Sequence, residues 1–384
     1  MRKRIGNLFR NTLLGVALVT SAAAASGATH ETALLGEATR PVDVVICVDV
    51  SGSMQDLLDS ARARVWDIVN QLSGMRPTPE LRVGLLSYGT HDSTAENGWI
   101  SLRLDLTDDL DSVYAELMAL TIGGGDEFVG RVVETAVDRM SWTPAWNALR
   151  IMFVAGNESA DQGVEGHDFR VATRAASDRG IIVNALYAGN REQGVSERWH
   201  EVARHGGGNF SAIDPATGTI QIPTPQDDLL LELNAQLNGT YLPYGERGRA
   251  GLANQVAQDT NASRLGVQSC SSRIVAKGGA LYTNASWDLV DASLEDDFEW
   301  YRLEVRLLPE AMQAMNDEER QEHVERYRAA REAIQLDIQR VSAEREAFIE
   351  SALLRQGGTA GLGDAMQAAI CEQATQRGFD ADGC

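Results

Sequence analysis

The residues whose types and spacing best suit chemistry lie in Asp43–Met54 (DVVICVDVSGSM). An unbroken apolar run is followed by Asp49, Ser51 and Ser53, which place one carboxylate and two hydroxyls at alternate positions. Such oxygen donors suit a hard cation, and magnesium in particular prefers oxygen ligands and usually keeps some waters. The same residues could instead cap a helix, because Asp and Ser accept hydrogen bonds from free backbone N–H groups. With a strand before it and a helix after it, the pattern favours a cation-binding loop.

The elements that would position this loop alternate along residues 43–237. Apolar runs without polar alternation predict strands buried on both faces, and the stretches between them have helical spacing. The predicted strands are 44–48, 82–87, 151–155, 181–187 and 209–213, and the predicted helices are 55–72, 108–120, 127–140, 168–179, 196–204 and 225–237. Ile100–Leu104 alternates apolar and polar residues, which predicts an antiparallel edge strand. The expected fold class is therefore α/β, with a mostly parallel sheet covered by helices.

The character of the sequence changes after Asn238. Residues 239–262 are rich in Gly, Pro, Asn and Gln and predict a linker, and residues 263–300 have no clear pattern. After Pro309 the chain lacks Gly and Pro as far as residue 354, which favours one long helix. Its apolar residues recur at three-, four- and seven-residue spacings and form a single stripe. A short helix is expected over about 364–377.

The apolar stripe of the long helix has two interpretations that the sequence leaves open. It could form a short coiled coil, and hence a homodimer through residues 309–354. It could equally pack on the middle region of its own chain. Arg331 and Arg345 occupy core-type positions of the same heptad frame, and charged residues there weaken a tight dimer seam.

The N-terminus has the layout of a secretory signal peptide. Arg2–Arg4 is basic, Leu13–Val19 is apolar, and Ala22–Ala28 supplies small residues for cleavage. The apolar part is too short to span a bilayer comfortably, and no later run is long enough. The first cysteine is Cys47, so a lipid-anchored cysteine at the cleavage site is not indicated. The chain is expected to be periplasmic or secreted, with no transmembrane segment after signal removal.

The expected organisation has five parts. These are a signal peptide (1–28), an α/β domain (40–238), a linker and mixed region (239–300), a long helix (301–356), and a short helix with a tail (357–384).

The charge of the chain is strongly acidic, with 34 basic and 55 acidic residues and a net charge of −21. Without the four basic residues of the signal segment (Arg2, Lys3, Arg4 and Arg10), 30 basic and 55 acidic residues leave −25. Such a surface repels nucleic acid and anionic lipid and attracts cations. An acidic surface that only maintains solubility is the simpler explanation.

The four cysteines suggest at most one disulfide. Cys47 lies inside the apolar strand and is expected to be a small buried residue. In an exported chain Cys371 could pair with Cys384, or Cys270 with Cys371, and the sequence does not choose between these pairings.

The order of these features resembles the von Willebrand factor type A (vWA) domain, a doubly wound α/β fold. The motif at 49–54 is followed in the expected order by four further segments. They are LRVGLLSY (81–88), TIGGGDE (121–127), IMFVAGNESADQG (151–163) and GIIVNALY (180–187). The resemblance covers about residues 40–238. It implies a metal-ion-dependent adhesion site on top of the sheet, holding Mg²⁺, or alternatively Mn²⁺ or Ca²⁺.

The resemblance also assigns site residues one by one. Asp49, Ser51 and Ser53 match the family's Asp-x-Ser-x-Ser directly. The family's threonine falls near Asp126, which is expected to be the oxygen donor, with Glu127 as the rival.

The third segment departs from the family pattern. Where the family has an aspartate after the fourth strand, this chain has Gly156, which offers no side-chain oxygen. Asn157, Glu158 and Asp161 are candidates to substitute for it. Asp126 would conserve the charge of the site if it replaced the lost aspartate.

No catalytic residue is expected, because the chain has no His-Glu-x-x-His motif and no Gly-x-Ser-x-Gly elbow. The resemblance implies a binding protein whose cation captures a carboxylate on a protein or cell-envelope ligand. The alternative is a scaffold protein of the cell envelope with a degenerate metal site, in which the helical C-terminal region carries the interaction.

Overall fold

The computed structural model describes residues 40–90, 93–163, 167–213, 222–356 and 362–380, all within one compact unit, Glu37–Cys384. The predicted signal peptide (1–28) and Cys384 lie outside the described residues.

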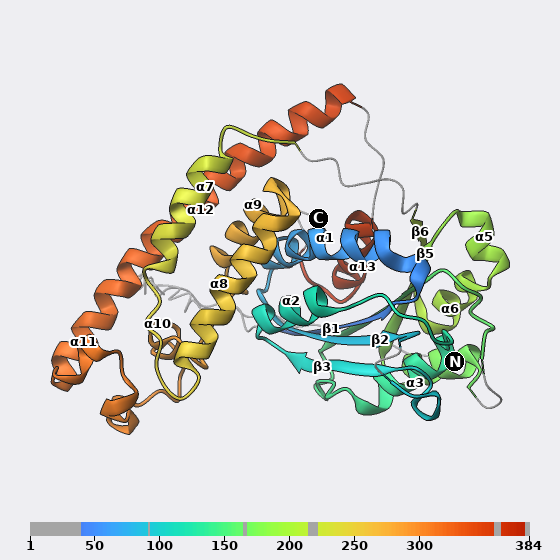
Figure 1. Cartoon of the computed structure of the whole chain (residues 1–384), viewed down its shortest axis with the longest axis horizontal. Helices are drawn as coiled ribbons and strands as arrows, with labels where there is room; N and C mark the ends of the chain where they lie inside the picture. Colours follow the sequence, from blue (N-terminus) through green and yellow to red (C-terminus); the bar gives the residue numbers. More distant parts are fainter. Residues whose placement is uncertain (1–39, 91–92, 164–166, 214–221, 357–361, 381–384) are drawn as a thin grey trace, which may run out of the picture. The chain divides into compact units, whose positions relative to one another are not determined.

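Six strands of the described chain form one sheet in the order β3-β2-β1-β4-β5-β6 (Figure 1). The strands are β1 (Arg40–Asp49), β2 (Pro79–Tyr88), β3 (Ser101–Thr107), β4 (Leu149–Gly156), β5 (Ile181–Ala188) and β6 (Gly207–Ile213). All neighbouring pairs are parallel except β2 and β3, so β3 is an antiparallel edge strand. The predicted α/β fold class and its antiparallel edge are confirmed.

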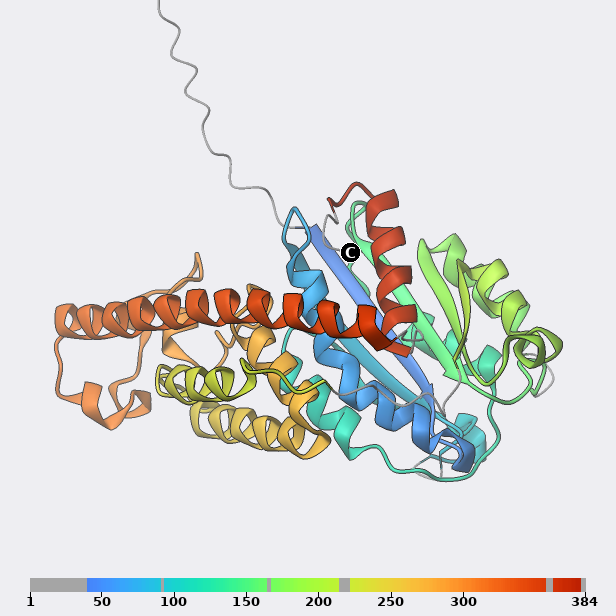
Figure 2. The same ribbon diagram turned by 90° about the horizontal axis from the view of Figure 1, so that it is seen from above.

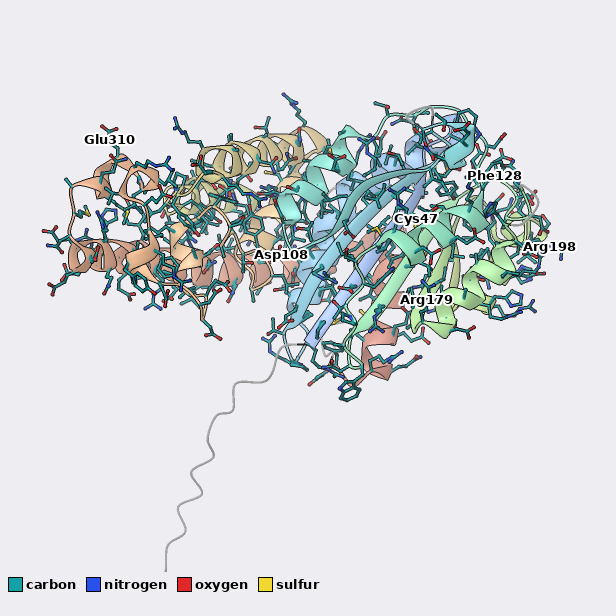
Figure 3. The ribbon with its side chains drawn as sticks, turned by 90° about the horizontal axis from the view of Figure 1, so that it is seen from below. Cys47, Asp108, Phe128, Arg179, Arg198 and Glu310 are labelled. Carbon is teal, nitrogen blue, oxygen red and sulfur yellow. The ribbon has the colours of Figure 1, made fainter. Side chains whose placement is uncertain are left out.

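Helices cover both faces of the sheet, as buried strands without polar alternation require. On β1, Val44 and Val48 belong to one apolar core, while Val45 and Cys47 belong to the other. The first core lies under α1 (Gln55–Ser73) and α2 (Leu110–Ala119), and the second under α3 (Val129–Arg139), α4 (Phe169–Asp178) and α6 (Trp199–Gly206). Short α5 (Arg191–Ser196) lies beside α6. Figure 3 shows Cys47 on the central strand, where it is a buried free thiol whose pKa is raised by burial.

A helix from the far end of the chain completes the first face of the sheet. The helix α13 (Leu362–Gln376) packs on α1, β4 and β6 (Figure 2). Gln373 exchanges hydrogen bonds of 2.7 and 3.2 Å with the buried Asn184 of β5, and Arg76 and Asp380 pair through their backbones. The short helix predicted over about 364–377 is therefore confirmed, and the described residues 362–380 belong to the sheet domain.

The helices that follow β6 form a separate layer beside α1 and α2. They are α7 (Asp227–Asn238), α8 (Gly248–Leu265), α9 (Val267–Lys277), α10 (Leu289–Ala292), α11 (Glu310–Gln313) and α12 (Asp317–Gln356), with short 3₁₀ turns η3 (Trp300–Arg302) and η4 (Val305–Leu307). The sequence assigned α7 to the sheet domain, but α7 packs on α9 and α12. The long helix begins at Asp317, later than the predicted 301, because short turns occupy the preceding residues.

The linker predicted over 239–262 is wrong, because α8 covers most of it. Its buried face is polar, with Gln255 and Gln258 inside, so the apolar spacing that marks most helices is missing. Its glycines permit close packing instead of flexibility: a Cβ on Gly248 would lie 2.8 Å from the carbonyl carbon of Pro243.

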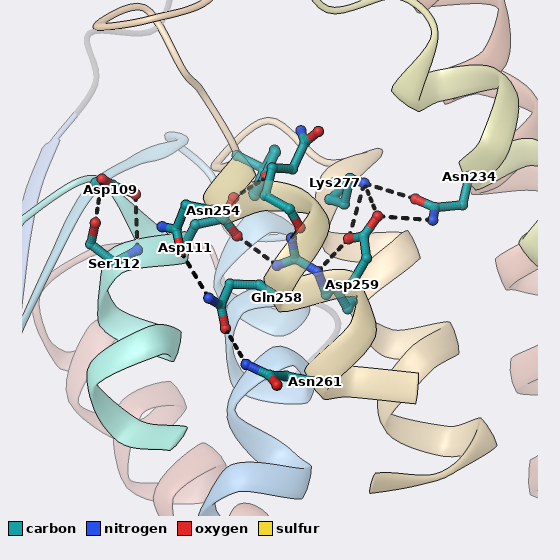
Figure 4. Close-up of polar contacts among 12 residues, drawn as sticks. Asp109, Asp111, Ser112, Asn234, Asn254, Gln258, Asp259, Asn261 and Lys277 are labelled. Carbon is teal, nitrogen blue, oxygen red and sulfur yellow. Dashed lines mark hydrogen bonds and ion pairs between the residues drawn. The ribbon is translucent and has the colours of Figure 1, made fainter. Parts of the chain in front are cut away.

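A buried ionic cluster joins this helical layer to the sheet domain (Figure 4). Arg273 of α9 pairs with Asp111 of α2 at 2.7 Å and with Asp259 of α8 at 2.6 Å. Lys277 pairs with Asp259 at 2.9 Å and donates to Asn234 at 2.8 Å. Burial lowers the pKa of Lys277 to about 8, and the charge of Asp259 opposes that shift. Each buried charge has a partner, as a stable interior requires.

The stripe of α12 packs on its own chain, as one of the two interpretations proposed. Val324, Ile338 and Val341 are buried against the helical layer. The two arginines at core-type positions are buried as well. Arg331 pairs with Asp288 at 2.6 Å, and Arg345 pairs with Asp227 at 2.9 Å. A homodimer would therefore have to use another surface of this helix.

Candidate functional site

The Asp-x-Ser-x-Ser motif forms the turn between β1 and α1. Asp49 ends the strand and is fully buried, and its Oδ1 accepts a hydrogen bond from the Ser51 backbone N–H at 2.7 Å. The Oγ atoms of Ser51 and Ser53 lie 3.4 Å apart. Neither serine caps the helix with its side chain, so these hydroxyls are not used as the helix-cap interpretation requires. The turn instead gathers three oxygen-bearing side chains at the carboxyl end of the central strand.

The glycine-rich loop lies directly beside this turn. The backbone N–H of Gly123 donates to the Val50 carbonyl at 2.8 Å, and Ser51 and Gly123 form a β-bridge. A Cβ on Gly125 would lie 3.0 Å from the ring of Trp99, so the glycine lets the indole cover the loop.

The two acidic residues of this loop have different surroundings. Asp126 is exposed, and its Oδ2 accepts a hydrogen bond from the Trp99 indole N–H at 3.3 Å. Glu127 is half-buried and lies beside Asp49. The position that a Cβ on Gly89 would take is 3.0 Å from both Asp49 Oδ1 and Glu127 Cγ. Partial burial raises the pKa of Glu127, and the negative charge of Glu158 adds to that rise.

The third loop explains why residue 156 is glycine. A Cβ there would lie 2.5 Å from Tyr88 Oη and 3.0 Å from two ring carbons of Trp199. The Tyr88 hydroxyl donates to the Ala155 carbonyl at 2.8 Å, and the Trp199 indole N–H donates to the Glu158 carbonyl at 2.7 Å. Aromatic side chains thus fill the space in which the family's aspartate would begin.

The three accessory candidates on this loop have different surroundings. Asn157 Oδ1 accepts a hydrogen bond from Ser53 Oγ at 3.2 Å, so Asn157 joins the motif. The side chain of Glu158 is exposed. Asp161 pairs with Arg170 at 2.6 Å, which holds the pKa of Asp161 below its usual value. Asp161 is therefore engaged in a surface ion pair instead of the site.

The electrostatics of the site centre on Asp49. Its Oδ2 is buried and has no hydrogen-bond partner. Burial raises the pKa of Asp49 to about 7, the hydrogen bond from the Ser51 backbone opposes the rise, and the charges of Glu127 and Glu158 add to it. A buried carboxylate oxygen without a partner is costly unless a cation or proton neutralises it.

The donor set fits a hard divalent cation. Asp49 Oδ2, the two serine hydroxyls and a nearby carboxylate are the oxygen ligands that Mg²⁺, Mn²⁺ and Ca²⁺ prefer. In the part of the chain that the structure describes, no group of three or more His, Cys, Asp or Glu side chains could hold a metal. A cation here would therefore depend on the serine hydroxyls.

Sequence reasoning missed four residues that shape the site: Gly89, Tyr88, Trp99 and Trp199. Gly89 has a φ of +64°, a backbone conformation that favours glycine, and its position directly after the second strand was a usable signal. No local pattern pointed to the two tryptophans, because they reach the site from distant loops and helices.

Cys47 is buried in β1, while Cys270 and Cys371 lie on α9 and α13. Cys371 is disulfide-bonded, whereas Cys270 is a free thiol. The alternative that paired Cys270 with Cys371 does not occur in the structure.

Comparisons with known proteins found one family model and several solved structures that resemble part of this chain. The family model for the von Willebrand factor type A domain matches residues 43–215. A vWA protein from Catenulispora acidiphila is 18% identical over 47% of this chain and 40% of its own, with a TM-score of 0.36. Proximal thread matrix protein 1 from the mussel byssus, in a structure with a zinc-occupied MIDAS motif, is 13% identical over 45% of this chain and 42% of its own, with a TM-score of 0.35.

A third structure is the vWF domain of the type V pilus tip protein Mfa5 from Porphyromonas gingivalis. It is 15% identical over 47% of this chain and 92% of its own, with a TM-score of 0.34. This chain thus spans less than half the length of the mussel and Catenulispora chains. No curated protein sequence matches it.

Proposed function

We propose that this chain, whose residues 43–215 form a von Willebrand factor type A domain, is an exported, non-enzymatic binding protein that captures a ligand through a divalent cation. The observation that carries the proposal is the buried Asp49 Oδ2, which has no partner and belongs to the same turn as two serine hydroxyls that lie 3.4 Å apart. Unpaired buried carboxylate oxygens are rare because they are costly, and they often mark ligand sites.

Four residues of the chain would have distinct roles in binding the cation. Asp49 would supply the buried carboxylate, and its hydrogen bond to the Ser51 backbone fixes the orientation of that group. Ser51 and Ser53 would supply neutral oxygens, and Asn157 positions the Ser53 hydroxyl. When bound, the cation supplies an open coordination position for an oxygen of the partner. A carboxylate on a protein or cell-envelope ligand is the proposed occupant of that position.

Export is part of the proposal. It rests on the signal-peptide pattern of the first 28 residues. Across the described residues, none of the helices combines the length and apolarity needed to cross a bilayer.

Gly156 favours a second candidate function. The Tyr88 hydroxyl and the Trp199 ring leave no room for the family's aspartate, so the site could be a degenerate one. The chain would then be a scaffold protein of the cell envelope, and the helical layer of α7–α12 would carry the interaction.

One capture experiment separates the two functions. Immobilised protein is incubated with cell-envelope extract in Mg²⁺, in EDTA, and in EDTA followed by excess Mg²⁺, with Asp49→Ala as the matched variant. Cation-dependent capture predicts a partner that is lost in EDTA, regained with Mg²⁺ and never retained by the variant. A partner retained equally under all conditions would overturn the cation model and support the scaffold function.

A further inference from the structure

We propose that Glu127, and not Asp126, supplies the second carboxylate of the cation site, and that Gly89 makes room for it. The inference rests on the proposed cation-binding function and decides which residue replaces the aspartate that Gly156 cannot provide. It concerns a residue outside the Asp-x-Ser-x-Ser motif.

The position of Glu127 is the first argument. Asp49 Oδ1 and Glu127 Cγ each lie 3.0 Å from the point where a Cβ on Gly89 would stand, so they are at most about 6 Å apart, twice that distance. Glu127 Oε1 lies 3.7 Å from the same point. Oxygens that share one cation at about 2.0–2.6 Å lie within about 4–5 Å of each other. A change of the Glu127 rotamer would bring its carboxylate oxygens within that separation of Asp49.

The engagement of Asp126 is the second argument. Its carboxylate accepts a hydrogen bond from the Trp99 indole and is exposed, while the Trp99 ring packs on Gly125 beside it. Trp99 itself has a φ of +56°, a conformation that a bulky residue adopts only when its surroundings fix it. The indole therefore holds Asp126 at the rim of the loop.

The third argument concerns what anchors Glu127. Its backbone N–H donates to the Gln162 side chain at 2.9 Å, which ties the second loop to the third. The following residue, Phe128, is buried at the start of α3. Glu127 is thus fixed at its backbone, and its side chain and Asp49 both border the space that Gly89 leaves open. A buried acid with one unpartnered oxygen and a second acid beside it are a pair that a divalent cation would neutralise.

The test compares Glu127→Gln with Asp126→Asn, because both variants remove one negative charge from adjacent positions without changing shape. Mn²⁺ alone is titrated into each protein by calorimetry at pH 7.5 and 0.15 M salt, and the titration is repeated with Ca²⁺. Glu127→Gln is expected to weaken Mn²⁺ binding by at least about tenfold, because loss of even a residue that only orients a metal ligand costs about 10–100-fold in affinity. Asp126→Asn is expected to change the Kd by no more than about threefold, because salt screens an exposed charge.

A second pair of variants tests the role of Gly89 without changing charge. In Gly89→Ala the new methyl would separate Asp49 from Glu127, so Mn²⁺ binding is expected to weaken by at least about tenfold. Gly245→Ala is the matched control, because Gly245 also has a positive φ, +71°, and no atom within 4 Å of the added Cβ. Circular dichroism melts report whether each variant is folded.

The outcomes separate this inference from the proposed function. If the wild-type protein binds neither Mn²⁺ nor Ca²⁺, the cation function itself fails. If the wild type binds and Asp126→Asn weakens binding as much as or more than Glu127→Gln, the cation function stands and the assignment of Glu127 is refuted. An unchanged Kd in Gly89→Ala would likewise refute the role given to Gly89.

Discussion

Replacing Gly156 tests the explanation given for the missing aspartate. In Gly156→Ala the added methyl would stand 2.5 Å from Tyr88 Oη and 3.0 Å from two Trp199 ring carbons, all closer than ordinary contacts. Trp199 is 1% exposed and Tyr88 is fully buried, so neither ring can move into solvent. Overpacking of this kind costs about 1–3 kcal/mol of unfolding free energy. Gly156→Asp is expected to cost more, because it also buries a charge.

The cost can be assigned to its cause with a double-mutant cycle. Tyr88→Phe removes the hydroxyl nearest to the new methyl and its 2.8 Å hydrogen bond to Ala155, at about 1 kcal/mol. Gly156→Ala should then cost about 1 kcal/mol less in the Tyr88→Phe protein than in the wild type, because the two positions are in contact. Part of the cost remains, since the Trp199 carbons stay in place.

Urea unfolding followed by circular dichroism measures each free energy in EDTA, so that no metal contributes. Gly52→Ala is the control, because nothing lies within 4 Å of its added Cβ. It should be neutral or slightly stabilising, by up to about 1 kcal/mol. If Gly156→Ala is as well tolerated as Gly52→Ala, or if the cycle is additive, the steric account of Gly156 is incorrect.

Three further predictions concern charge and packing. In metal-free protein the folded state of Asp49 binds its proton up to about pH 7, whereas the unfolded state releases it near 3.8, so this group lowers stability as pH rises through that window. The unfolding free energy of Asp49→Asn relative to the wild type should therefore rise between pH 4.5 and pH 8, by up to about 4 kcal/mol in urea titrations. The same difference between variant and wild type at both pH values would contradict this. Arg331→Met should lower the free energy of unfolding by about 3–5 kcal/mol, because it leaves the charge of the fully buried Asp288 without its ion-pair partner. Arg340→Met, on the exposed face of the same helix, should leave the melting temperature unchanged. Equal losses of stability in the two variants would argue against the docked position of α12. Ile338→Ala should cost about 2–5 kcal/mol at every protein concentration, since the side chain is buried within its own chain, and a cost that grows on dilution would indicate a dimer.

Much of the sheet domain could be predicted from local patterns. The run Val44–Val48 indicated a strand buried on both faces, and the structure places it at the centre of the sheet. The alternation in Ile100–Leu104 indicated an edge strand, which is β3. These predictions succeed because burial on one or two faces leaves a period in the sequence of the strand itself.

The helical layer shows where such patterns fail. Residues 248–265 form a helix whose inner face carries the buried Gln255 and Gln258, so no apolar period marks it in the sequence. The partners of the Gln258 side chain, Asn254 and Asn261, lie on the same helix. Arg331 and Arg345 interrupt the apolar stripe in the sequence of the long helix, but in the structure both are buried in ion pairs. A buried arginine is stable only when a carboxylate reaches it, and both of these carboxylates come from other elements, which the sequence of α12 alone does not reveal.

The sequence by itself determined the turn that gathers Asp49, Ser51 and Ser53, because three alternate positions after a buried strand fix those side chains locally. Only the tertiary structure decided what surrounds that turn. Trp199 occupies the space that the absent aspartate would need. Asp126 contacts the Trp99 indole, whereas Glu127 lies near Asp49. The helix α13, from the end of the chain, covers part of one face of the sheet. The physical reason is the same in each case: excluded volume and charge act between side chains that are close in space and distant in sequence.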